Sequence, residues 1–387
     1  MILHGLELQD FRNLQPTRLA FDPAFNLIYG DNGQGKTNLL EAAYLLLCQR
    51  SFRAARLGEL VRFGSDRGVV RGALQSAGVE HQIQVVLDAR GRHTELDGKA
   101  SRSLSHWPPG FTAVLFTTDD LTAPRGSPAD RRRLLDQAVA AVWAAYAELL
   151  RRYGRALRAR NRLLRERPPG VAALLDAHEP PLASLGAKIV VARQRLLAQL
   201  LPRVQAAFAR IIGADAPQQV ELRYLEGSAP DTPAALPSED GPGAAEAERL
   251  AERLAAGWRR DRARDLARGL TTHGPHSDDL ELRLDGRPLR QHASQGQVRA
   301  LVLAFKVAQI LDLHSRSGEY PALLLDDVSS ELDALRNRFL HDFLGEVRCQ
   351  LLLTTARPEL VPWRGRGASF EVVRGTVTQR EADPGAA

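Results

Sequence analysis

The chain has 387 residues, 44% hydrophobic and 25% charged, a composition ordinary for a soluble globular protein with room for one large or two ordinary domains. No run approaches the ~18 apolar residues of a membrane span, and the charged N-terminus is unlike an export signal. Two cysteines in apolar surroundings, Cys48 and Cys349, favour a reducing compartment, so we expect a cytoplasmic protein without a membrane partner. The net charge of +6 is compatible with a nucleic-acid partner and equally with arginine-rich codon usage.

The first part of the chain, residues 1–125, reads as mixed α/β structure. Short β-like runs separated by turns predict strands at 2–8, 18–21, 26–29, 69–73 and 82–87. One helix interrupts them, opening at a glycine-rich loop and running through residue 45.

Residues 126–269 have a helical pattern instead. Ser127 reads as a helix cap, with Pro128 in the first turn and Asp130 near the free N–H groups. The spacing of apolar residues predicts one helix to about residue 164, a second over 182–211 with Pro202 as a position for a kink, and a third over 244–268. The segment 227–243 is a loop by composition. Helices that run out and back predict an antiparallel arm.

The mixed pattern returns over residues 270–387. It predicts a hairpin at 280–286, a helix after Ser294, a buried strand at 322–325, a helix over 331–347 and a strand at 351–354. The predicted fold is therefore an α/β head in two halves, interrupted by a helical insertion.

A phosphate-binding loop lies between the strand at 26–29 and the helix that follows. Its residues are Gly30, Asp31, Asn32, Gly33, Gln34, Gly35, Lys36 and Thr37. Glycines let backbone N–H groups surround phosphates, and the helix N-terminus adds positive potential. We expect ATP here, with Lys36 on the β- and γ-phosphates and the Thr37 hydroxyl on Mg²⁺.

A second motif ends the apolar strand at 322–325 with two carboxylates. Asp326 is placed to join the Mg²⁺ shell, and Asp327 to orient or deprotonate an attacking water as the catalytic acid–base group alongside Lys36. A third motif, Ser294-Gln295-Gly296-Gln297, opens a helix. Its capping box is a sufficient structural explanation by itself, although a capped helix N-terminus is also an anion site.

Together these motifs resemble the ABC-type ATPase head, and their order is similar to that of the RecF family of bacterial recombination mediators over nearly the whole chain. The loop with its continuation to Glu41 resembles Walker A, residues 323–327 Walker B, residues 294–297 the ABC signature, and residues 330–333 the D-loop. Features more particular to the family are Asp10-Phe11-Arg12-Asn13, Gly126-Ser127-Pro128, Arg131-Arg132-Arg133, Arg160-Asn161 and Gly274-Pro275-His276-Ser277-Asp278-Asp279.

The resemblance implies an ATP-switched dimer that binds DNA and, with RecO and RecR, helps load recombinase at gaps. It also implies nucleotide contacts by Arg12, Asn13, Ser294 and Gly296, and a weak DNA-stimulated ATPase acting as a switch. A plain surface turn would explain Arg12 and Asn13 nearly as well. Three departures stand out: Asp327 replaces the usual glutamate, Thr354-Thr355 occupies the place of a common histidine, and Val298 follows Gln297 where a second glutamine is usual.

The basic cluster Arg131-Arg132-Arg133 follows a helix cap, where positive charge opposes the helix dipole, so we expect it to contact DNA. Further arginines on the first arm helix fit either a solvated face or phosphate contact. Because aromatic residues make up only 6%, gapped or duplex DNA is favoured over single strands.

Two other classes share the generic motifs. The ATPase subunit of a membrane transporter would lack the long helical insertion and the Asp10–Asn13 opening, and a structural SMC-like chromosome protein would carry a far longer coiled coil.

Overall fold

The computed structural model describes residues 1–54, 56–89, 91–101, 107–108, 110–213, 218–227, 244–328, 331–361 and 367–380. The chain divides into two compact units: unit 1 contains Met1–Leu121 and Arg299–Ala387, and unit 2 contains Thr122–Val298. Unit 2 is thus inserted in sequence between the halves of unit 1. Within the described ranges, no helix combines the length and the apolar character needed to span a membrane.

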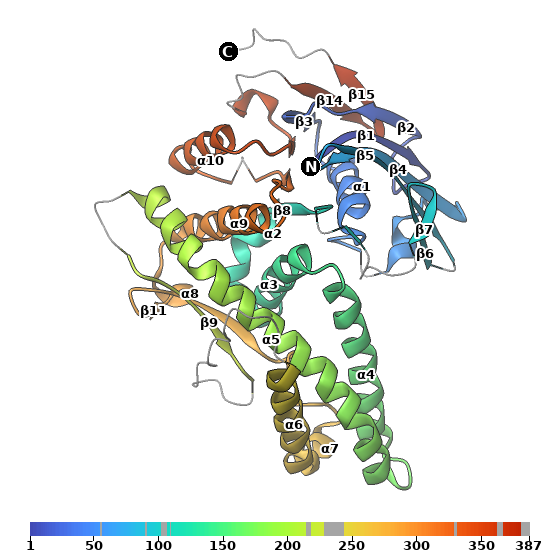
Figure 1. Cartoon of the computed structure of the whole chain (residues 1–387), viewed down its shortest axis with the longest axis vertical. Coiled ribbons are helices and arrows are strands. Elements are labelled where there is room, and N and C mark those ends of the chain that lie inside the picture. Colours follow the sequence, from blue (N-terminus) through green and yellow to red (C-terminus); the bar gives the residue numbers. More distant parts are fainter. Residues whose placement is uncertain are drawn as a thin grey trace. The chain divides into compact units, whose positions relative to one another are not determined.

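One six-stranded sheet of unit 1 forms the platform for the glycine loop (Figure 1). Its order is β15 (Thr376–Arg380), β14 (Ala368–Val373), β3 (Phe25–Tyr29), β13 (Leu351–Thr355), β12 (Ala322–Asp326) and β8 (Ala113–Thr117). All neighbours are parallel except β14 and β15. The leucine runs of β12 and β13 are fully buried, as expected for parallel strands covered on both faces.

The second six-stranded sheet of unit 1 is antiparallel. Its order is β2 (Thr17–Ala20), β1 (Ile2–Gln9), β4 (Arg67–Ser76), β5 (Val79–Asp88), β6 (Gly91–Leu96) and β7 (Lys99–Ser101). The helices assigned to this unit are α1 (Lys36–Cys48), α10 (Ala334–Glu346), most of α9 (Gln295–Ser317) and α2 (Thr118–Thr122), with short 3₁₀ turns at Leu57–Leu60 and Pro358–Leu360. Helix α1 is buried along nearly its whole length, because nearly all its residues after the first turn are apolar, with the buried Glu41 as the charged exception.

Unit 2 combines helices with a small sheet. Its helices are α3 (Pro128–Val142), α4 (Tyr146–Glu166), α5 (Val171–Ile212), α6 (Ala244–Arg260), α7 (Arg262–Arg268) and α8 (Leu289–His292), after a 3₁₀ turn at Ala123–Arg125. The sheet order is β11 (Arg287–Pro288), β10 (Asp279–Leu284) and β9 (Val220–Leu225). Helices α4 and α5 pack side by side, joined at the turn that follows Glu166 (Figure 1).

A buried ion cluster ties this helical pair to α7. Arg160 on α4 donates to Glu179 on α5 at 2.9 Å and to Asp265 on α7 at 2.8 Å, and all three side chains are fully buried. Beside it, Asn161 accepts hydrogen bonds from the backbone N–H and hydroxyl of Thr271. The Arg160-Asn161 pair therefore serves the internal framework of unit 2.

Most predicted elements are found close to their expected places, with local differences. The second arm helix starts earlier, at Val171, and continues through Pro202 as one helix. The third helix breaks into α6 and α7 at Asp261, which takes a non-helical conformation there. Strands β6 to β9, β14 and β15 were not predicted, and the expected loop at 227–243 lies outside the described residues from 228 onward.

The division into units also differs from the expected one. The first boundary lies at 121/122 instead of 125/126, and the second at 298/299 instead of 269/270. The reason for the second difference is strand pairing: β10 pairs antiparallel with β9, which keeps the segment after residue 269 within unit 2. Ser294 and Gly296 therefore belong to unit 2, whereas the glycine loop belongs to unit 1.

Candidate functional site

The loop between β3 and α1 needs its glycines for two separate reasons. Gly30, Gly33 and Gly35 all have positive φ angles, of 148°, 79° and 121°, where other residues are strained. In addition, a Cβ on Gly30 would lie 2.3 Å from the Val372 carbonyl oxygen, and one on Gly35 would lie 2.9 Å from a Leu14 methyl. The backbone therefore follows a tight curve that side chains at Gly30 and Gly35 would disrupt.

The remaining loop residues differ in their surroundings. Asp31 and Asn32 are exposed, whereas Gln34 is held by the turn between two strands. The Gln34 carbonyl accepts from the Gly375 N–H at 3.0 Å, and its side-chain oxygen accepts from the Arg374 N–H at 2.6 Å. The turn between β14 and β15 thus fixes one side of the loop.

Lys36 lies across this loop. Its ammonium donates to the carbonyl oxygens of Gly30 at 2.6 Å and Asp31 at 2.8 Å. Burial lowers the pKa of Lys36, and the nearby carboxylates of Asp327, Asp326 and Asp31 oppose that shift. An ammonium enclosed by a glycine loop at a helix N-terminus is positive charge placed to bind phosphate oxygens.

Strand register brings Thr37 and Asp326 together. Asp326 ends β12 level with Thr354 of β13, which is in turn level with Ile28 of β3, one residue before that strand ends. The Thr37 hydroxyl donates to Asp326 Oδ1 at 2.9 Å. Burial raises the pKa of Asp326, against the hydrogen bonds from Thr354 and Thr37. A hydroxyl and a carboxylate oxygen in contact are the donors that Mg²⁺ takes at phosphate sites, so the residues fit this ion.

Thr354 holds both acidic residues in place. Its hydroxyl donates to Asp326 Oδ1 at 2.8 Å. The Asp327 N–H donates to the hydroxyl and carbonyl oxygens of Thr354, each at 3.1 Å. Asp327 itself has a φ of 54°, a left-handed conformation that aspartate and asparagine tolerate better than most residues. The sequence pattern does not predict this role of Thr354, because its contact with Asp326 depends on strand order.

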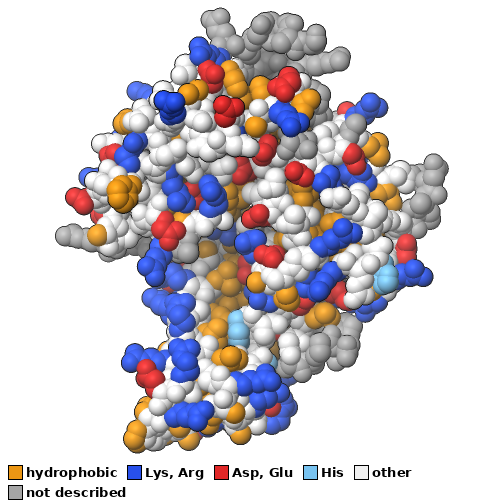
Figure 2. Space-filling view, turned by 180° about the vertical axis from the view of Figure 1, so that it is seen from behind, with side chains coloured by type: hydrophobic (Ala, Val, Ile, Leu, Met, Phe, Trp, Pro, Cys, Tyr) orange, Lys and Arg blue, Asp and Glu red, His pale blue; other side chains and the backbone are white. Residues whose placement is uncertain are grey.

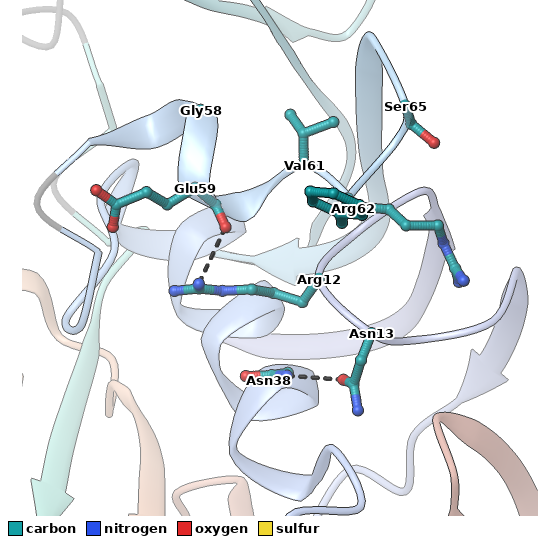
Figure 3. A pocket seen from close by; sticks show the side chains of 9 residues that line it. Arg12, Asn13, Asn38, Gly58, Glu59, Val61, Arg62 and Ser65 are labelled. Atoms are coloured by element: carbon teal, nitrogen blue, oxygen red, sulfur yellow. Dashed lines mark hydrogen bonds between the residues drawn. The ribbon is translucent and has the colours of Figure 1, made fainter.

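Arg12 and Asn13 lie beside the first turns of α1. Arg12 makes a two-pronged pair with the buried Glu41 at 3.0 and 3.2 Å and donates to the Glu59 carbonyl at 3.0 Å. Asn13 accepts from the Asn38 side chain at 2.7 Å and donates to the Gln34 carbonyl at 3.3 Å (Figure 3). Asn13 therefore touches the loop directly, whereas Arg12 is braced against α1.

A hollow of about 830 Å³ opens next to these residues. Arg12, Asn13 and Asn38 line it on the loop side, and the segment from Gly58 to Ser65 lines the rest (Figure 3). Phe63 in that segment is fully exposed. An exposed aromatic side chain at the edge of a hollow beside a phosphate loop is suited to a planar base. Asn38 belongs to the segment that follows the glycine loop, but Phe63 does not stand out from the sequence, since only the fold brings its segment beside the loop.

The helix that starts at Gln295 is capped as expected. The Gln297 N–H donates to the Ser294 hydroxyl at 3.1 Å, and the Ser294 N–H donates to the Gln297 side-chain oxygen at 2.7 Å. Ser294 is exposed and Gly296 half-buried. Of the segment expected to be the D-loop, Ser330 lies outside the described residues, and Glu331 pairs with Arg299 at 3.0 Å.

The three arginines after the Ser127 cap have different surroundings. Arg131 is buried, donates to both oxygens of Asp279 at 2.8 and 2.6 Å, and donates to the Gly126 carbonyl at 2.8 Å. Arg132 donates to the Asp278 carbonyl at 2.6 Å. Arg133 is exposed and pairs with Asp130 at 3.1 Å. The geometry of Arg131 fits a structural role that ties α3 to β10, whereas Arg132 is half-buried and Arg133 is exposed.

A parallel sheet with a glycine loop after one strand and a carboxylate after another defines this protein as an ATPase head of the ABC type. A sequence profile described as the RecF/RecN/SMC N-terminal domain matches residues 2–366. The DNA replication and repair protein RecF of Anaeromyxobacter sp. (strain K) is 44% identical over 381 residues, which cover 97% of this chain and 98% of that protein. The chain therefore belongs to the RecF family.

Two solved structures agree with this assignment. One, described as the recombination mediator protein RecF-ATPrS in the RecFOR pathway, is 29% identical with a TM-score of 0.82, over 97% of each chain. Another, described as the same mediator with ATP, is 30% identical with a TM-score of 0.77, over 98% of this chain and 99% of the other. The expected fold, an ABC-type head, is confirmed.

Proposed function

We propose that this chain is an ATP-dependent DNA-binding protein of replication and recombinational repair. The observation that carries the proposal is the contact between Thr37 and Asp326 at the end of an intact glycine loop, because it assembles the phosphate and metal ligands from two distant segments. Membership of the RecF family, with solved relatives described with ATP, supports the choice of nucleotide. Residues 30–37 would hold the phosphates, and Asn13 would adjoin them.

Within this site each polar group has a distinct task. Lys36 would neutralise the β- and γ-phosphates, and Thr37 with Asp326 would hold Mg²⁺, whose chemistry there is to balance phosphate charge. Asp327 would orient and deprotonate the attacking water. The aspartate, shorter than glutamate, fits slow turnover, and we therefore propose a weak ATPase that serves as a switch.

ATP would act by joining two copies of the chain. In the proposed dimer, the N-terminus of the capped helix at Ser294 and Gly296 in one copy meets the γ-phosphate held by the other. The dimer would bind gapped or duplex DNA and act with RecO and RecR to help load recombinase. The family relatives named for the RecFOR pathway support these partners.

The test is ATP hydrolysis measured with and without DNA. We expect slow phosphate release by the protein alone and faster release when gapped or duplex DNA is added. As a control, Asp327→Asn should release phosphate far more slowly than the parent in both conditions. A rate of ATP hydrolysis that stays the same at every DNA concentration would refute the link between nucleotide and DNA.

A further inference from the structure

One helix of unit 2 exposes arginine almost exclusively. Helix α4 carries six exposed arginines, at positions 151, 152, 155, 158, 162 and 165. Its only acidic residues are Glu148 and Glu166, near its two ends. Figure 2 shows basic side chains gathered on the part of the molecule that carries this helix.

Five of these arginines form one row, called here the arginine stripe: Arg151, Arg155, Arg158, Arg162 and Arg165. Steps of four and three residues keep them on one face, and the row is about 21 Å long at the rise of an α-helix. The opposite face of α4 is committed to packing, since Tyr153, Arg160 and Leu164 are buried there. The stripe therefore faces solvent along its whole length.

Local ion pairs do not neutralise the stripe. Arg151 pairs with Glu148 at 2.5 Å, Arg155 reaches the same carboxylate only at 3.9 Å, and Arg162 pairs with Glu166 at 2.7 Å. Among the described residues, Arg158 and Arg165 have no carboxylate within 4.0 Å. Excess positive charge thus persists through the second half of the helix.

A neighbouring helix shows how an ordinary solvated face looks in this unit. Helix α6 carries three glutamates, at 246, 248 and 252, against four arginines, at 249, 253, 259 and 260. Mixed signs of this kind are usual on surfaces that only need solvation. The single sign of the α4 face therefore needs a different explanation, which is a polyanion that supplies the missing negative charge.

We propose that the arginine stripe binds the phosphate backbone of double-stranded DNA, an inference that rests on the DNA-binding function proposed above. At 3.4 Å per step along one strand, a row of about 21 Å spans roughly six phosphates. The face holds no aromatic side chain on which an unpaired base could stack, because Tyr153 is buried. Contact is thus to the backbone and independent of base sequence.

The experiment measures the affinity for a labelled duplex in the presence of ATP over a series of salt concentrations. The test variant carries Arg155→Gln, Arg158→Gln and Arg162→Gln, and the control removes the same charge from α6 with Arg249→Gln, Arg253→Gln and Arg259→Gln. Each phosphate contact contributes about 0.9 to the slope of log K against log salt, so the test variant should lose ~2.7 from the slope. The control should keep the slope of the parent.

A third variant, with lysine at the same three positions of α4, should restore most of the slope, because lysine neutralises phosphate as a point charge. If the glutamine variants of α4 and α6 change the slope equally, or neither changes it, the stripe is not the binding face. If the parent protein fails to bind duplex at any salt concentration, the proposed function itself has failed.

Discussion

Among single residues, Lys36 is the one whose charge a bound phosphate would compensate most directly. Its ammonium is largely buried, its pKa is lowered by that burial, and its two hydrogen bonds are to backbone carbonyls of the loop. A phosphate would supply the full negative charge that these carbonyl dipoles only approximate.

Lys36→Met should therefore abolish ATP binding and leave the fold intact, since methionine fills a similar volume without the charge. Calorimetric titration with Mg²⁺-ATP would measure the affinity, and circular dichroism would report the fold. A folded variant with the affinity of the parent would show that the loop is not the nucleotide site.

Asp327 offers a clean separation of binding from turnover. Asparagine accepts the same left-handed backbone, so Asp327→Asn should preserve the loop after β12 while removing the carboxylate. ATP affinity should stay within a few-fold of the parent, and phosphate release should fall by the ~10²–10⁴-fold that a general base contributes. Release at the parental rate would remove Asp327 from the catalytic role.

At the scale of elements, the arm depends on a cluster that crosses three helices. Arg160 pairs with both Glu179 and Asp265, and none of the three side chains reaches solvent. Arg262 is a second partner of Glu179, at 2.7 Å. The Arg160 guanidinium also lies 5.4 Å from the centre of the Trp258 ring. Removing Arg160 would leave two carboxylates buried with part of their charge unpaired.

Arg160→Met should lower the free energy of unfolding by about 3–5 kcal/mol, the usual cost of breaking a buried ion pair from one side. Denaturant titration followed by tryptophan fluorescence would measure the change. Arg162→Met is the matched control, because this arginine lies on the same helix with its side chain 72% exposed, and it should change stability little. Equal effects of the two substitutions would contradict the role assigned to Arg160.

The elements also show what sequence could and could not foresee. The glycine loop, the Ser127 and Ser294 caps and the strand at 322–325 depend on neighbours within a few residues, and their chemistry was readable directly. The contacts of Thr354 with Asp326 and of β10 with β9 depend on strand order, which local patterns do not contain.

Arg131 shows the same limit for a residue predicted to contact DNA. Its sequence context suggested exposed charge, but its partner Asp279 lies 148 residues away, and the pairing buries the guanidinium. Charge runs alone do not distinguish an arginine that meets solvent from one that meets a distant carboxylate. Burial in the folded chain is what distinguishes the exposed arginines of α4 from the buried Arg131.

At the scale of the whole molecule, the proposed dimer predicts that Ser294 matters more to assembly than to folding. Ser294→Arg should leave ATP binding by a single chain nearly unchanged and abolish ATP-dependent dimers, by placing bulk and charge at the interface. Losing the cap would cost only ~1 kcal/mol, too little to unfold a domain. Light scattering with and without ATP would give the molar mass, and a variant that dimerises like the parent would disprove the composite site.

The proposed function depends most on control of DNA binding by ATP at the glycine loop. The direct measurement is the affinity for labelled gapped, duplex and single-stranded DNA, with and without ATP, for the parent and for Lys36→Met. ATP should tighten binding of gapped and duplex DNA by the parent by about tenfold or more, within the usual range of coupling between sites, and should have no effect on Lys36→Met. Equal affinities with and without ATP in the parent, or the same response in both proteins, would contradict ATP control of DNA binding.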